Sequence, residues 1–161
     1  MTKTIKIILS ISLILFFQIG IFPHLKIFGV YPNLILISII ALGILRGFKE
    51  TLIWAIIGGL FLDFYSFNSI FGISLICLIV VSFVAFFIVQ NIFKKTNSSS
   101  VALIFLITVT LYDLLLLVFY KILGIEFEFT FVKLIINVFY NAIIAMPVFY
   151  ALKKLFPSRN I

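Results

Sequence analysis

Hydrophobic residues follow one another in long runs along this chain, and short polar or charged groups separate the runs. Six runs predict helices that cross a lipid bilayer, because a membrane span needs about 20 consecutive apolar residues. The runs cover residues 5–22, 32–45, 48–63, 70–93, 101–120 and 130–152. The second and third runs are shorter than a bilayer is thick. Each is therefore predicted either to extend into flanking residues or to be a broken helix packed inside the bundle.

The composition also indicates that lipid, and not water, surrounds this chain. Hydrophobic residues make up 65% of the sequence and charged residues only 11%, whereas a soluble domain averages about 25% charged residues. A soluble domain of this size keeps too much surface in water to bury so many apolar side chains. We therefore expect residues 1–161 to form one all-α integral membrane domain, a compact bundle of about six transmembrane helices.

The basic residues predict how the bundle is oriented. Six spans place both termini on the same side of the membrane, and nine of the twelve basic residues fall on that side. The positive-inside rule assigns that side to the cytoplasm. The net charge of +7 is thus explained by insertion and by contact with anionic lipid headgroups, and nucleic-acid binding is excluded. The nine residues are Lys3, Lys6, Arg46, Lys49, Lys94, Lys95, Lys153, Lys154 and Arg159, and Lys26, Lys121 and Lys133 fall on the other side.

Three polar residues lie well inside the predicted fifth and sixth spans, namely Asp113, Asn137 and Asn141. A charge at the centre of a span costs about 2.5–3.5 kcal/mol, so such residues need a reason. The two asparagines are one helical turn apart and share a face, at depths that bracket the depth of Asp113. We expect one interhelical hydrogen-bonded cluster, with Asp63 as a further candidate member. Such a cluster serves either as structural glue or as a ligand or proton site.

Asp63 follows two glycines near the end of the third predicted span. Gly58 and Gly59 are expected to let a neighbouring helix approach closely, because glycine has no side chain. Asp63 and the polar residues after it are expected to satisfy free backbone groups at the turn into the fourth span. Asn68 or Ser69 is the predicted N-cap of that span.

The sequence contains no recognisable catalytic, cofactor-binding or metal-binding motif. His24 is the only histidine, and Cys77 is the only cysteine. Two aspartates in membrane spans raise the possibility of an intramembrane aspartyl protease, but the Gly-x-Gly-Asp sequence of those enzymes is missing. We expect a protein that is not an enzyme and that uses no cofactor.

Several short motifs occur along the chain in the same order as in the rod shape-determining protein MreD family, which the chain therefore resembles. That family typically shows Pro-Asp or Pro-Asn, then Leu-Arg-Gly, then Gly-x-x-x-Gly-Leu-x-x-Asp and a later glycine. Here asparagine stands where many members have aspartate, and the two glycines of the third span are adjacent. The corresponding residues, which are also the candidate structural or partner-binding residues together with Asp113 and Asn137, are Pro32, Asn33, Arg46, Gly47, Gly58, Gly59, Asp63, Gly72 and Asn141.

The resemblance covers nearly the whole chain and implies a specific role. MreD-like proteins are non-catalytic membrane scaffolds of the cell-wall elongation machinery in the bacterial cytoplasmic (inner) membrane. The implied partners are MreC, a single-span protein, and further MreB, RodA and a penicillin-binding transpeptidase. The family fold resembles the S component of energy-coupling-factor vitamin transporters. That likeness supplies the alternative, a vitamin-binding S component, although the first span has no alanine for the Ala-x-x-x-Ala stripe by which S components dock.

Overall fold

The computed structural model describes residues 3–65, 70–92, 97–125 and 130–156, and each of the six apolar runs forms a helix. A short 3-10 helix, η1, and an isolated bridge between Ile27 and Val30 lie in the connection between the first two helices. The helices are α1 (Lys3–Gly20), α2 (Leu34–Leu45), α3 (Phe48–Tyr65), α4 (Ile73–Asn91), α5 (Ser98–Ile122) and α6 (Phe131–Leu155), with η1 at Phe22–His24.

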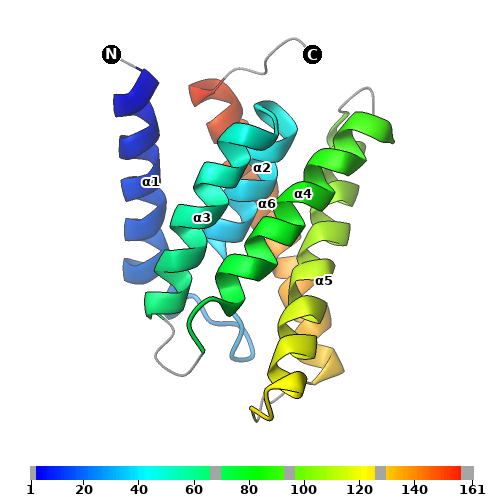
Figure 1. Cartoon of the computed structure of the whole chain (residues 1–161). Helices are drawn as coiled ribbons and strands as arrows, with labels where there is room; N and C mark the ends of the chain where they lie inside the picture. Colours follow the sequence, from blue (N-terminus) through cyan, green and yellow to red (C-terminus); the bar gives the residue numbers. More distant parts are fainter. Residues whose placement is uncertain (1–2, 66–69, 93–96, 126–129, 157–161) are drawn as a thin grey trace.

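Successive helices run in opposite directions along the bundle (Figure 1). The first residues of α1 and the last residues of α6 consequently lie at the same end. Among the described residues, α4, α5 and α6 are long and apolar enough to cross a membrane. Two apolar helical stretches are shorter, namely Leu9–His24, which covers the second part of α1 and η1, and Leu34–Leu45, which is α2.

The second helix is the centre of the bundle. All 12 residues of α2 are buried, and α2 packs against α1, α3, α4, α5 and α6. A helix that is apolar on all sides is stable when neighbouring elements surround it completely. At 1.5 Å per residue α2 spans only about 18 Å, against about 30 Å for the hydrocarbon core. Its two ends therefore lie among longer helices, where backbone groups need partners from the protein.

Two adjacent glycines bring α3 close to two neighbours at once. A Cβ atom placed on Gly59 would lie 2.5 Å from the Cα atom of Leu75 in α4. A Cβ atom on Gly58 would overlap the Cγ2 atom of Ile35 in α2. Since these residues follow one another, α3 contacts α2 with one face and α4 with the next, and both contacts require the absence of a side chain.

Two helices begin later than the sequence predicts. α2 was expected from Pro32, but Pro32 lies outside the helix, and Asn33 is the N-cap in an extended conformation (φ −96°, ψ 92°). α4 was expected from residue 70 with Asn68 or Ser69 as its N-cap. Those two residues lie outside the described part of the chain, and the N-cap prediction is wrong because Gly72 occupies that position with φ +102°. A positive φ of this size favours glycine.

Candidate functional site

Side chains from three parts of the chain bond the free N–H groups at the start of α2. The first N–H groups of a helix have no partner within the helix. Here the N–H of Asn33 donates to Oδ1 of Asn141 at 2.8 Å, and the N–H of Leu34 donates to Oε1 of Gln18 at 2.6 Å. The N–H of Leu36 donates to the side chain of Asn33 at 3.0 Å. The buried start of α2 is thereby joined to α1 and to α6.

Sequence reasoning did not identify Gln18 as part of this site. The available signal was the position of this amide, near the end of the first apolar run and a short connection before the next run. Gln18 is buried, and a buried amide in a membrane protein needs a polar partner. The sequence did not indicate that this partner is the start of α2, which lies beside Gln18.

Asp113, Asn137 and Asn141 lie together and form a chain of hydrogen bonds between α5 and α6. The side-chain amide of Asn137 donates to Oδ2 of Asp113 at 2.7 Å. The amide of Asn141 donates to Oδ1 of Asn137 at 2.7 Å and to the carbonyl of the same residue at 2.8 Å. Because Asn141 also accepts the N–H of Asn33, the chain runs from the carboxylate of Asp113 to the backbone at the start of α2.

Asp63 lies apart from this chain and caps α4. Its carboxylate accepts the N–H groups of Gly72 at 2.9 Å, Ser74 at 2.9 Å and Leu75 at 3.2 Å. An anion at a helix N-terminus is favoured by the helix dipole, and hydrogen bonds to a charged acceptor are the stronger ones. Asp63 is itself buried. These bonds confirm the prediction that Asp63 satisfies free backbone groups at the turn into the fourth span, whereas the predicted N-cap at Asn68 or Ser69 is wrong.

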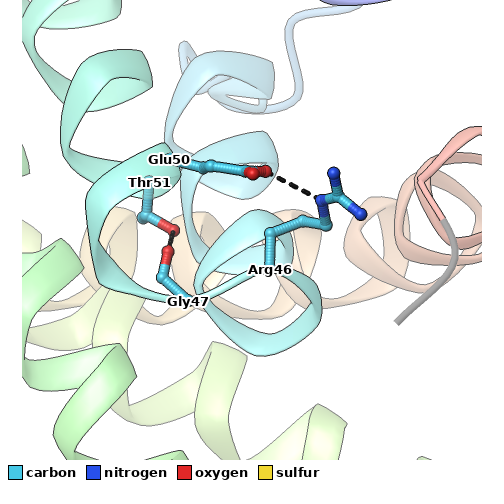
Figure 2. Close-up of polar contacts among 4 residues, drawn as sticks. All are labelled: Arg46, Gly47, Glu50 and Thr51. Atoms are coloured by element: carbon cyan, nitrogen blue, oxygen red, sulfur yellow. Dashed lines mark hydrogen bonds and ion pairs between the residues drawn. The ribbon is translucent and has the colours of Figure 1, made fainter. Parts of the chain in front are cut away.

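The opposite end of α2 is closed by the Leu-Arg-Gly motif (Figure 2). Gly47 has φ +98°, which lets the two-residue connection turn from α2 into α3. Nε of Arg46 lies 2.8 Å from Oε2 of Glu50, and Oγ1 of Thr51 donates to the carbonyl of Gly47 at 2.8 Å (Figure 2). The guanidinium group of Arg46 also lies 5.9 Å from the ring centre of Phe156, so this turn contacts the end of α6.

A cavity of about 200 Å³ lies at the start of α2. Every helix of the bundle contributes to its wall, together with the loop before α2. The polar side chains in the wall include Gln18, Tyr31, Asn33, Tyr112, Asp113 and Asn137.

Tyr31 lies in the loop that precedes α2, at the wall of this cavity. Burial, and then the nearby phenol of Tyr65, raise the pKa of Tyr31 above its ordinary value. Its phenol is therefore protonated at neutral pH and able to donate a hydrogen bond into the cavity.

The described residues do not assemble a recognisable reactive group. In residues 3–65, 70–92, 97–125 and 130–156, no cluster of three or more histidine, cysteine, aspartate or glutamate side chains could hold a metal ion. Asp63 and Asp113 bond to different groups, the first to the backbone of α4 and the second to Asn137. Gln18, Asp63 and Asn141 instead bond backbone groups at the starts of helices.

These features define a small helical membrane protein in which buried polar residues join short and long apolar helices. A family model described as rod shape-determining protein MreD matches residues 1–156. The chain therefore belongs to the MreD family, and this membership associates it with the determination of rod shape. The searches of curated proteins and of solved structures gave no significant match.

Proposed function

We propose that this protein is a non-catalytic membrane scaffold of the cell-wall elongation machinery, which binds an MreC-like single-span protein. The observation that carries the proposal is the match of the MreD family model to residues 1–156. MreB, RodA and a penicillin-binding transpeptidase are the further partners that the proposal includes.

The positions of the motif residues support a scaffold. Asn33 caps α2, Gly47 makes the turn into α3, and Asp63 caps α4. Gly58 and Gly59 permit close packing of α3 against its neighbours. Together these residues define the start of α2, the turn from α2 into α3, the packing of α3 against α2 and α4, and the start of α4. We propose that the core so formed presents the outer faces of the bundle to a partner in a constant geometry.

The proposal includes six membrane spans with both termini in the cytoplasm, in the inner membrane. It is supported by the common position of the start of α1 and the end of α6 (Figure 1). The α2–α3 turn with Arg46 and the start of α3 with Lys49 lie at the same end. The α1–α2 connection with Lys26 and the end of α5 with Lys121 lie at the other end. The likeness to the S-component fold belongs to this proposal as well, but no comparison favours the vitamin-binding alternative.

Copurification tests the proposed partner. The full chain, tagged and extracted in mild detergent, is coexpressed with the single-span MreC-like protein of the same bacterium. An unrelated single-span protein of the same membrane is the control. We expect the MreC-like protein to copurify in a stable ratio and the control protein to be absent. A folded, monodisperse preparation of this chain without the MreC-like protein would overturn the proposal.

A further inference from the structure

The cavity at the start of α2 is a direct consequence of the length of that helix. α2 occupies the centre of the bundle but begins only at Leu34, whereas α5 and α6 have 25 residues each. Beyond the start of α2, the surrounding helices enclose space that no central helix fills. The cavity of about 200 Å³ occupies this space.

The cavity has a buried inner wall and a more accessible rim. Gln18, Leu62 and Tyr112 are buried, whereas Tyr31 and Asp113 retain partial exposure. An engineered cavity of about 150 Å³ is large enough to bind benzene. The present cavity therefore has room for a ligand somewhat larger than a single aromatic ring.

The charge in the cavity wall determines whether a cationic or an anionic ligand is favoured. Of the described residues that line the cavity, Asp113 alone carries a charge. Asn137 donates to Oδ2 of Asp113, and the other carboxylate oxygen accepts no hydrogen bond from the described residues. This oxygen is available to a donor inside the cavity.

The start of α2 could favour an anion in place of a cation, because a helix N-terminus attracts anions. However, the N–H groups of Asn33, Leu34 and Leu36 are already bonded to side chains. An anion in the cavity would thus find few free donors on α2 and would face the carboxylate of Asp113. The phenol rings of the lining tyrosines, in contrast, attract cations through their faces.

We propose that this cavity binds a small organic cation, with a protonated amine against Asp113 and an apolar body among the tyrosine and leucine side chains. Apolar surface for the body of the ligand is supplied by Leu36, Leu62 and Leu116. A metal ion is a poorer match, because the described residues offer no group of three histidine, cysteine, aspartate or glutamate side chains. The proposal does not rest on the binding of a single-span partner.

A series of three related probes tests the sign and the size of the ligand. The full chain in non-ionic detergent is titrated with benzylammonium, benzyl alcohol and benzoate, and binding is followed by calorimetry and by the melting temperature. We expect benzylammonium alone to bind and to raise the melting temperature. Asp113→Asn is expected to weaken binding about tenfold or more, which corresponds to the loss of about 1.4 kcal/mol.

Two further variants separate binding from folding. Leu116→Trp fills the cavity without a change of charge and should abolish binding, so it tests the site even where Asp113→Asn does not fold. Glu50→Gln removes an acidic group near the opposite end of α2 and should leave binding unchanged. The proposal is overturned if benzylammonium does not bind, if the three probes bind equally, or if the folded cavity variants bind it as the unmodified protein does.

Discussion

Asp63 is a buried carboxylate that accepts three backbone N–H groups at the start of α4. A residue with this many charge-assisted hydrogen bonds should contribute strongly to stability. Its removal leaves three backbone donors without this partner, and the loss is most costly for the buried N–H of Ser74.

Asp63→Ala should lower the free energy of unfolding by about 1–3 kcal/mol. The measurement is thermal or denaturant unfolding of the full chain in detergent. Asn91→Ala is the matched control, because the exposed amide of Asn91 bonds only a carbonyl of its own helix in the described structure and its loss should have little effect. Equal stability of Asp63→Ala and the unmodified protein would contradict the assigned role.

The sequence predicted part of the residue-scale picture. Asp113, Asn137 and Asn141 were placed together because helical spacing sets both the face and the depth of a side chain. The connection of Asn141 to the start of α2 was not predictable in the same way, since it depends on how α2 lies against α6. Gln18 was missed for the same reason.

At the scale of elements, α3 is defined by two contacts that only glycine permits. A side chain on Gly59 would meet backbone of α4, which moves only if the whole helix moves. Gly43 in α2 is also a buried helical glycine, but its nearest neighbour would be 3.6 Å from an added Cβ. The two glycines therefore differ in the space around them and not in their secondary structure.

Gly59→Ala should destabilise the bundle by about 1–3 kcal/mol through overpacking between α3 and α4. Gly43→Ala, the matched control, should change stability by less than about 1 kcal/mol and in the stabilising direction, because alanine is the better helix former. Unfolding of both variants in detergent gives the comparison. A Gly59→Ala protein as stable as Gly43→Ala would show that α3 and α4 are not closely packed at this position.

The second run was predicted either to extend into flanking residues or to be a broken helix packed inside the bundle, and α2 is a continuous helix packed inside the bundle. An apolar helix presents the same composition whether lipid or protein surrounds it, so its central position depends on packing with the other helices. Its short length was the one available signal. The sequence correctly predicted that Asp63 bonds backbone groups at the start of α4. The start itself was predicted too early, because Gly72, and not a local polar residue, is the N-cap.

At the scale of the whole molecule, the basic residues and the path of the helices predict the same topology. Both ends of the described chain lie at one end of the bundle (Figure 1). The basic residues of the α2–α3 turn and of the last turn of α6 lie at that end as well. The positive-inside rule predicts that this end faces the cytoplasm.

Cysteine labelling in cells tests that topology. In a Cys77→Ala background, Lys49→Cys and Lys26→Cys place single thiols at exposed positions at opposite ends of the bundle. A membrane-impermeant maleimide should label Lys26→Cys in spheroplasts and should label Lys49→Cys only after the membrane is permeabilised. Labelling of both variants from the same side would contradict six spans with this orientation.

The most direct test of the central claim is cell shape after depletion of this protein in the bacterium that encodes it. Cell width and length are measured by microscopy, with the loss of the protein verified and with a plasmid copy as the control. If the protein is a scaffold for rod-shaped growth, depleted cells should widen and become round, and the plasmid copy should restore rods. Rods of unchanged width and length over several generations without the protein would contradict the account.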